Sequence, residues 1–384
     1  MTLGELPQNF RQQLQPLQTS ILRTTEALRN RLAAEVRHPT LTHPPPPVSQ
    51  TVAEFQAPAF LPARGAILDF VTGADVKTIQ EIGTKLFESL FQQDVYLLYK
   101  SALDAAHEAT GKHLSIKLYA EPPELAYIPW ETLYDKRGFH LCCTGTTLFA
   151  RTATVNDEDL YIYDKPPIRI LGVISAPKSF IGTPHELNTY AEQAALNLTL
   201  GSFSKDVKLG WTTAGTYREL ARRLTKGDDG ARWDVLLFIG HGVPGHIVLE
   251  KDGGNEYEFL KAEDLQGLLW QPLGPRLVIL NSCRGAQSES GDRFASTAEI
   301  LVRSGPIAAV IAMQFDISDI MGTTFSPAFF TNLMYNVSVQ HAMYLTRLDL
   351  RRQGFSEWIS PVLYMQNKDG MVVRPSAAAG GGSQ

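Results

Sequence analysis

The chain has 384 residues, of which 44% are hydrophobic, and these values are ordinary for a soluble protein with one large or two moderate domains. Its 40 acidic and 35 basic residues give a formal charge of -5, which excludes the basic excess needed to bind nucleic acid through bulk electrostatics. We therefore expect protein or peptide partners. The three cysteines show no metal-ligand or disulfide spacing, and neither a signal peptide nor a run of about 20 apolar residues is apparent. These features predict a cytoplasmic protein that does not span a membrane.

The first 50 residues predict a helix followed by a spacer. Apolar residues recur at helical spacing in residues 19–36, which predicts a helix that packs on the domain or contacts a partner. The four consecutive prolines at 44–47 cannot be helical, so residues 38–49 are expected to form a semi-rigid polyproline spacer. We place a domain boundary near residue 50, after this N-terminal helix and Pro-rich linker (1–50).

Residues 51–165 mix helical and strand patterns. A helical stretch is expected over about 76–109, and the alternation of apolar and polar residues in 114–118 is typical of a half-buried strand. No catalytic pattern occurs here, and we interpret Trp130 as a core residue because large aromatic side chains are highly buried on average. This region is expected to be a smaller α/β half that acts as a scaffold.

Residues 166–375 alternate between strand and helix patterns. Strands are expected at 168–174, 233–239, 276–280, 308–313 and 362–364. Helices are expected at 185–198, 216–224, 262–269, 297–303 and from 323 to 336 or beyond. This alternation predicts a mainly parallel α/β sheet flanked by helices. The last residues, 376–384, predict a flexible tail.

Two of these strands lead to residues that a hydrolase would use. His241 follows the apolar run 235–239 by two residues, and Cys283 follows the run 277–280 by three. In open α/β sheets, ligands bind beyond the carboxyl ends of the strands, and neighbouring strands lie about 4.8 Å apart. If the two strands are neighbours, His241 can serve as the general base for a Cys283 nucleophile.

The residues around both strand ends resemble the catalytic segments of caspase-like cysteine peptidases. These segments are Phe-Ile-Gly-His-Gly at 238–242 and Asn-Ser-Cys-Arg-Gly at 281–285. Three further stretches, at 123–131, 310–319 and 358–364, resemble the prokaryotic CHAT branch of this group (clan CD), which is related to separase. The resemblance spans about residues 60–370. It implies a Cys/His dyad in a caspase-like catalytic half (166–375), preceded by the non-catalytic half of the CHAT region (51–165).

Backbone groups beside the dyad are expected to bind the developing oxyanion. Gly240 and Gly242 allow a sharp turn and close approach of a substrate, and the N–H groups of Gly242 and Cys283 are the candidate donors. Taken alone, Cys283 and His241 are each explained as ordinary buried residues, but their places at two strand ends within the family motif favour catalysis. No third triad member is evident. Four other histidines are interpreted as structural: His140, His185, His246 and His341.

Acidic residues after the strand expected at 308–313 predict the substrate preference. The segment Gln-Phe-Asp-Ile-Ser-Asp at 314–319 resembles the tryptophan-aspartate segment of separases, with Phe315 in place of tryptophan. Separase-like pockets are acidic and accept arginine or lysine, whereas caspase pockets are basic and accept aspartate. We assign Asp316 as the acid that binds the substrate, with Asp319 as second choice and Asn281 in the pocket wall, because a carboxylate binds a guanidinium bidentately. The simpler alternative is that both aspartates cap the next helix.

The sequence therefore predicts a cysteine endopeptidase that cleaves proteins after arginine or lysine. The resemblance further implies gating by a regulatory partner or signal in a prokaryotic regulatory or defence system. The alternative is a catalytically silent caspase-like module for binding or scaffolding, against which the intact dyad argues. A glutamine amidotransferase would need a nucleophile on a strand-to-helix elbow and an acid near the histidine, and neither is apparent. No P-loop or HExxH motif is present, so we predict no cofactor and no metal site.

Overall fold

The structure is a computed structural model of the chain. It describes residues 76–108, 113–119, 128–153, 161–162, 166–183, 185–281, 295–303, 306–315, 317–335 and 338–366. The predicted N-terminal helix, the Pro-rich spacer and the C-terminal tail lie outside these residues.

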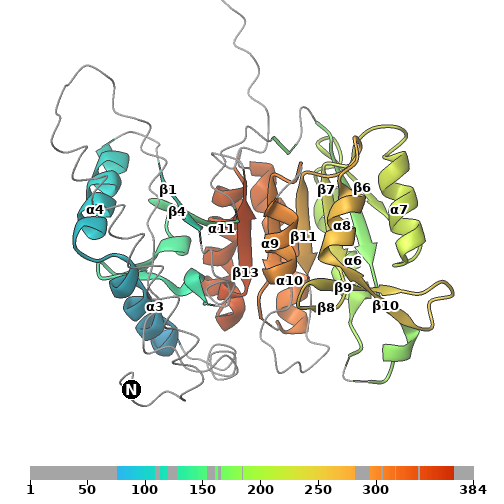
Figure 1. The fold of residues 1–384 in the computed structure, drawn as a ribbon, viewed down its shortest axis with the longest axis horizontal. Helices are drawn as coiled ribbons and strands as arrows, with labels where there is room; N and C mark the ends of the chain where they lie inside the picture. The colour runs from blue at the N-terminus through green and yellow to red at the C-terminus, as the bar shows by residue number, and fades with distance from the viewer. Residues whose placement is uncertain are drawn as a thin grey trace, which may run out of the picture.

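An eight-stranded sheet forms the centre of the molecule (Figure 1). Its strands are β1 (Leu114–Tyr119), β4 (Thr147–Thr152), β5 (Ile168–Ile174), β6 (Val207–Trp211), β7 (Val235–Ile239), β11 (Leu277–Asn281), β12 (Ala309–Met313) and β13 (Pro361–Met365). They lie in the order β1-β4-β13-β12-β11-β7-β5-β6. Among these strands, β12 and β13 pair antiparallel and the other neighbours pair parallel. The predicted mainly parallel α/β fold is confirmed.

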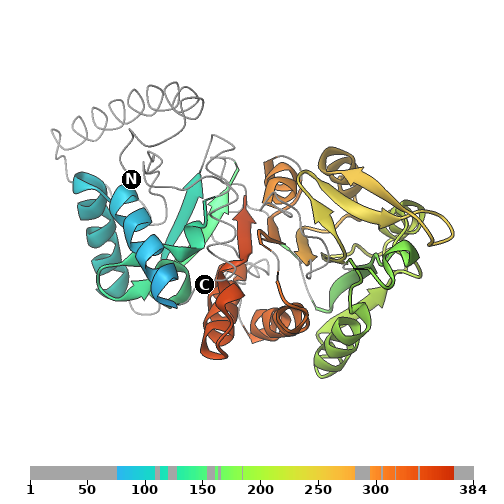
Figure 2. The ribbon, with the colours of Figure 1, turned by 90° about the horizontal axis from the view of Figure 1, so that it is seen from below.

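Helices cover both faces of the sheet (Figure 2). The described helices are α3 (Val76–Leu90), α4 (Gln93–Glu108), α6 (Thr189–Gly201), α7 (Tyr217–Lys226), α8 (Ala262–Leu269), α9 (Ala295–Arg303), α10 (Asp319–Tyr335) and α11 (Val339–Arg352). One buried apolar cluster joins α3, α4, α6, α10 and α11 to one face, and a second joins α7, α8 and α9 to the other. Successive residues of β7 alternate between these clusters, because side chains of a strand point to opposite faces. None of the described helices is both long and apolar enough to cross a membrane.

The N-terminal half extends the same sheet. β1 pairs with β4 along its full length, and β4 pairs with β13 through Arg151 and Tyr364. Two short strands, β2 (Tyr134–Asp135) and β3 (Phe139–His140), lie between the 3₁₀ turns η2 (Trp130–Thr132) and η3 (Leu141–Cys143). Trp130 is 1% exposed, as expected for a core residue. The sheet therefore connects the two halves, while the domain boundaries stay predictions.

The helical stretch expected over 76–109 is divided into α3 and α4. The chain breaks after Leu90, and Gln93, the first residue of α4, has a φ of 38°, a left-handed conformation that the interior of one continuous helix does not contain. The break allows the rings of Phe87, Phe91 and Tyr99 to pack together, with centroids 4.4 to 5.7 Å apart. Tertiary packing of these aromatic rings thus replaces one long helix by two.

The last helix expected before the closing strand is also two helices, α10 and α11. Ser338 begins the second, because its Oγ accepts a hydrogen bond from the N–H of His341 at 3.5 Å. Similarly, α6 begins at Thr189 instead of residue 185, with Asn188 as the capping residue. The sequence pattern also left β4 and β6 unassigned. Only β5, β7, β11 and β12 among the parallel strands of the catalytic half carry the long apolar runs that made them recognisable.

Candidate active site

β7 and β11, the strands that lead to His241 and Cys283, are neighbours in the sheet. Their register pairs Ile239 with Asn281, and the N–H of Gly240 donates to the carbonyl oxygen of Asn281 at 3.2 Å. His241 follows Ile239 by two residues, and Cys283 follows Asn281 by two. The expected strand adjacency is confirmed. Cys283 lies outside the described residues, so its contact with His241 stays a prediction.

His241 is oriented by a backbone carbonyl. Its Nε2 lies 2.6 Å from the carbonyl oxygen of His185. Because a carbonyl only accepts hydrogen bonds, Nε2 must carry the proton, and Nδ1 of the neutral ring is then an acceptor. The ring of Phe180 packs on the imidazole at 5.0 Å between centroids and an interplanar angle of 83°. The hydrogen bond at Nε2 therefore holds the ring in place, and Nδ1 is able to accept a proton, as a general base requires.

The carbonyl of His185 is a functional group that residue patterns do not reveal. Every residue has a backbone carbonyl, so no residue type marks this one. The segment that follows η4 (Lys178–Phe180) places this carbonyl beside His241. Hydrogen bonds connect η4 to a turn between two strands further along the chain. The N–H groups of Lys178 and Ser179 donate to the carbonyls of Gly254 and Asn255 at 2.9 and 3.0 Å.

After His241 the chain forms a three-stranded antiparallel sheet in the order β10-β9-β8, made of β8 (Gly242–Val243), β9 (His246–Glu250) and β10 (Tyr257–Lys261). The N–H of Val248 donates to the carbonyl of His241 at 3.0 Å. This bond makes Gly242 and Ile247 a non-hydrogen-bonded pair of the ladder, so the N–H of Gly242 points away from β9. That direction is compatible with an oxyanion donor, and the role of Gly242 stays a prediction.

Gly240, Gly242 and Gly245 also match the GxGxxG spacing of dinucleotide-binding loops. In such loops a helix follows, and its N-terminus binds the pyrophosphate. Here β8 and β9 follow instead. The glycines have local explanations, because a Cβ on Gly240 would lie 2.7 Å from the Phe238 ring and Gly245 has a φ of 71°. The match therefore reflects turn geometry and gives no support to nucleotide binding.

Asn281 fixes the end of β11 to two helices. Its side chain is fully buried, and Nδ2 donates to a carboxylate oxygen of Glu192 on α6. The same nitrogen lies 3.3 Å from the carbonyl of Gly322 and from Oγ of Ser326, both on α10. Ser326 in turn donates to Glu192 at 3.3 Å. The strand that leads to Cys283 is thus anchored by a buried polar cluster. The predicted place of Asn281 in a pocket wall stays a prediction.

The structure describes only one of the two candidate acids. Asp316 lies outside the described residues. Asp319 is the first residue of α10 and its side chain is exposed. Ser318 caps this helix, since its Oγ accepts the N–H of Met321 at 3.2 Å. An acidic residue in the first helical turn interacts favourably with the helix dipole, which fits the simpler alternative for Asp319. Substrate binding by either acid stays a prediction.

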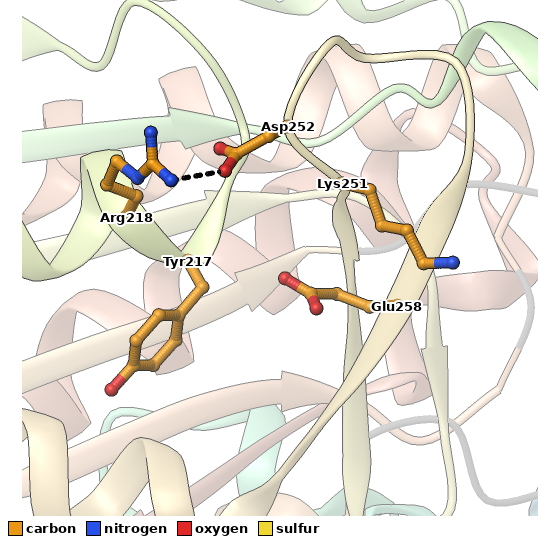
Figure 3. Close-up of a pocket in the computed structure, with 5 residues that line it drawn as sticks. All are labelled: Tyr217, Arg218, Lys251, Asp252 and Glu258. Atoms are coloured by element: carbon orange, nitrogen blue, oxygen red, sulfur yellow. Dashed lines mark ion pairs between the residues drawn. The ribbon is translucent and has the colours of Figure 1, made fainter.

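A surface hollow of about 430 Å³ lies between the β9–β10 hairpin and the start of α7 (Figure 3). It is lined by Tyr217, Arg218, Lys251, Asp252 and Glu258. Arg218 and Asp252 form an ion pair across it at 2.7 Å. Glu258 faces the hollow, whereas the preceding residue Tyr257 contacts Phe180 at 5.0 Å on the His241 side, since side chains alternate along a strand. The hollow is therefore separate from the candidate active site.

Comparison with protein families gives one match that covers most of the chain. The model described as the CHAT domain matches residues 79–357. No curated protein matches the sequence. The matched range includes both strand ends and two of the three additional stretches, 123–131 and 310–319, whereas the third, 358–364, begins just after it.

Several solved structures are similar to this chain. The separase–securin complex of Saccharomyces cerevisiae is 13% identical, with a TM-score of 0.40, and the alignment covers 71% of this chain and 17% of that chain. The Arg-specific cysteine proteinase gingipain R is 12% identical, with a TM-score of 0.43, covering 80% and 75% of the two chains. A Porphyromonas gingivalis RgpB complex of pro- and mature domains is 11% identical, with a TM-score of 0.41, covering 80% and 77%. This chain thus spans less than a fifth of the separase chain.

Proposed function

Because the chain belongs to the CHAT domain family, we propose that it is a cysteine endopeptidase in which Cys283 is the nucleophile and His241 the general base. The observation that carries this proposal is the hydrogen bond from His241 Nε2 to the carbonyl of His185. It leaves Nδ1 as the proton acceptor, at the end of the strand next to β11. The parallel register further supports the dyad, since each residue follows the paired positions Ile239 and Asn281 by two.

The proposed reaction follows from these roles. Nδ1 of His241 takes the thiol proton of Cys283, and the sulfur attacks the scissile carbonyl carbon. The N–H groups of Gly242 and Cys283 bind the oxyanion of the tetrahedral intermediate. The C–N bond then breaks as His241 gives its proton to the leaving amine. Water, deprotonated by His241, hydrolyses the resulting thioester and regenerates the thiol. The carbonyl of His185 stabilises the imidazolium at each stage by accepting from Nε2.

The preference for arginine or lysine is proposed from the sequence of the segment after β12. Asp316 is the acid that binds the basic substrate side chain, Asp319 is the second choice, and Asn281 contributes to the wall. A carboxylate that accepts two charge-assisted hydrogen bonds from one guanidinium favours arginine over lysine. The family resemblance also supports gating by a regulatory protein in a prokaryotic regulatory or defence system. The absence of disulfide spacing supports a cytoplasmic location.

Replacement of the dyad tests the catalytic proposal. Cys283→Ala and His241→Ala should each abolish cleavage of a peptide library, while circular dichroism and the unfolding midpoint stay as in the wild type. The assay is run with the protein alone and with the proteins encoded beside its gene, because an activator is expected. If the Cys283→Ala protein cleaves at the wild-type rate, the mechanism is wrong. If the wild type cleaves nothing in either assay, the silent binding module is the better description.

Peptides that differ only in the residue before the scissile bond test the specificity proposal. Asp316→Ala should lower kcat/KM for arginine substrates by the equivalent of about 1.5 to 3 kcal/mol, the value of a charged hydrogen bond. Substrates with citrulline, which has nearly the same shape as arginine without its charge, should respond far less. A wild-type preference for aspartate, or no discrimination between arginine and citrulline, would remove the acidic pocket.

A further inference from the structure

The three stretches that tie the sequence to CHAT meet in one buried polar network. Glu131 comes from the first stretch, Gln314 from the second, and the carbonyl of Ile359 from the third. Arg151 donates from Nε and Nη2 to the two carboxylate oxygens of Glu131, with the Nε bond at 3.1 Å. Nη2 also donates to Oε1 of Gln314 at 3.0 Å. Gln314 Nε2 in turn lies 3.0 Å from Glu131 and 2.8 Å from the carbonyl of Ile359.

The network is enclosed in the protein. Glu131, Arg151 and Gln314 are 0%, 3% and 2% exposed. Burial alone lowers the pKa of Arg151, but the carboxylate of Glu131 outweighs burial, and the pKa lies above its usual range. Arg347, 1% exposed, adds a second positive charge 3.9 Å from Glu131. Removal of one partner would leave a buried charge without compensation, so the three side chains act as a unit.

The chain on both sides of Asp316 is hydrogen-bonded to the turn before β13, and the side chain of Gln314 links this turn to the unit. The N–H of Gln314 donates to the carbonyl of Ser360 at 3.0 Å. Phe315 is fixed twice by the same serine, since its N–H donates to Ser360 Oγ at 3.1 Å and its carbonyl accepts from that hydroxyl at 2.8 Å. Beyond Asp316, the N–H of Ser318 lies 3.3 Å from a carboxylate oxygen of Glu357. The backbone before and after Asp316 is therefore anchored to the turn before β13, and the side chain of Gln314 connects this region to the N-terminal half.

We propose that Glu131, Arg151 and Gln314 are positioning residues for the substrate pocket: they set the place of the 314–318 segment, so the N-terminal half determines how well the protease selects a basic substrate. The inference rests on the proposed function of Asp316. A bidentate contact needs its carboxylate in a fixed position, and a misplacement of about 1 Å can cost 10²-fold in activity. The alternative is that the network only stabilises the fold.

Asp135 provides a matched control for that alternative. It also is a fully buried carboxylate of the N-terminal half with an arginine partner, Arg137, at 2.7 Å. It accepts a further hydrogen bond from Tyr99 at 2.7 Å. No contact in the described part of the chain links Asp135 to the 314–318 segment. Asp135→Asn should therefore destabilise the protein, less strongly than Glu131→Gln because Arg137 is partly exposed, without moving the pocket.

Hydrogen exchange tests the positioning without any need for activity. In the full chain, Glu131→Gln and Gln314→Met should accelerate amide exchange in the peptide 314–319 by about 5- to 30-fold, as expected when one or two hydrogen bonds are lost. Asp135→Asn should leave this peptide unchanged. Gln314→Met keeps the Glu131–Arg151 pair and serves if Glu131→Gln fails to fold. Equal exchange in the Gln314→Met and wild-type proteins, or equal acceleration by Asp135→Asn, would overturn the inference.

Substrate discrimination separates this inference from the proposed function. Glu131→Gln and Gln314→Met should each lower the arginine-to-citrulline ratio of kcat/KM by about 10- to 100-fold, mainly through KM, whereas Asp135→Asn keeps the wild-type ratio. Because the residues act as a unit, the double variant should be no worse than either single variant. If Asp316→Ala leaves the ratio unchanged, the pocket assignment is wrong. If Asp316→Ala lowers it and neither network variant does, only the positioning proposal fails.

Discussion

Two buried histidines of this protein make similar local contacts in different regions of the molecule. His241 is 5% exposed and His140 is 1% exposed. Each places one ring nitrogen on a backbone carbonyl, Nε2 on His185 at 2.6 Å and Nδ1 on Thr132 at 2.8 Å. His241 follows a central strand beside the strand that leads to Cys283. His140 lies in the N-terminal half, between the rings of Tyr134 and Trp358 at 4.8 and 4.9 Å.

Burial and a carbonyl partner alone therefore do not distinguish the proposed catalytic histidine, His241, from His140. What differs is the position of the ring relative to the carboxyl ends of the parallel strands, where ligands bind in α/β sheets. His140 is enclosed, and burial lowers its pKa to about 4 despite the contact with Thr132. We therefore expect replacements of His241 to affect the reaction and replacements of His140 to affect folding.

The largest expected effect comes from replacing each of the two histidines in turn by alanine. His241→Ala should lower kcat/KM by roughly 10³-fold or more, because the thiol loses its base, and should change the free energy of unfolding by less than about 1 kcal/mol. His140→Ala should instead leave kcat/KM near the wild-type value and lower the free energy of unfolding more strongly. Urea unfolding and peptide cleavage on the same preparations measure both quantities. Comparable losses of stability in the two variants would contradict the distinction between the regions.

Glu131 precedes Thr132, whose carbonyl contacts His140, and we expect its replacement likewise to affect folding. Glu131→Ala should lower the free energy of unfolding by about 3 to 5 kcal/mol, because Arg151 and Arg347 would keep buried charges without their carboxylate. Chemical denaturation monitored by tryptophan fluorescence measures the change. A loss below about 1 kcal/mol would mean that the pair contributes no more than a surface ion pair.

His140 should also give the stability a dependence on pH. Its folded pKa of about 4 lies below the usual value of 6.5 for an unfolded histidine, so the unfolded chain binds a proton that the folded chain rejects. The contribution is complete above pH 6.5 and is lost as the pH falls from 6.5 towards 4, by at most about 3 kcal/mol. His140→Asn, which retains an N–H donor for Thr132, should flatten this part of the profile. If His140→Asn shows the wild-type slope of stability against pH, other titrating groups produce that slope.

The smallest effect is expected at Asp319, on the exposed start of α10. Asp319→Asn should lower stability by about 0.3 to 1 kcal/mol, since it removes only a favourable charge at the helix N-terminus. The arginine-to-citrulline ratio should stay at the wild-type value, in contrast to Asp316→Ala. Loss of arginine preference in Asp319→Asn would instead make Asp319, our second choice, the specificity acid.

Elements with a strong local pattern could be predicted closely from the sequence. The strand expected at 168–174 is β5 (Ile168–Ile174), and the helix expected at 262–269 is α8 (Ala262–Leu269). The CHAT resemblance, predicted from short motifs, is confirmed by the family match over residues 79–357. In contrast, the break between α3 and α4 depends on aromatic rings that meet only in the folded chain. β6, at the edge of the sheet, has a partly exposed pattern that apolar runs do not identify.

The sequence by itself determined which residue types stand at the ends of β7 and β11, because apolar periodicity and glycine positions depend on neighbours a few residues away. Only the tertiary structure decided that the carbonyl of His185 orients His241, 56 residues further along the chain. It also decided that Glu131 meets Gln314 across a separation of 183 residues. Contacts of this range are set by strand order and by the need to satisfy buried polar groups, and neither leaves a local pattern in the sequence.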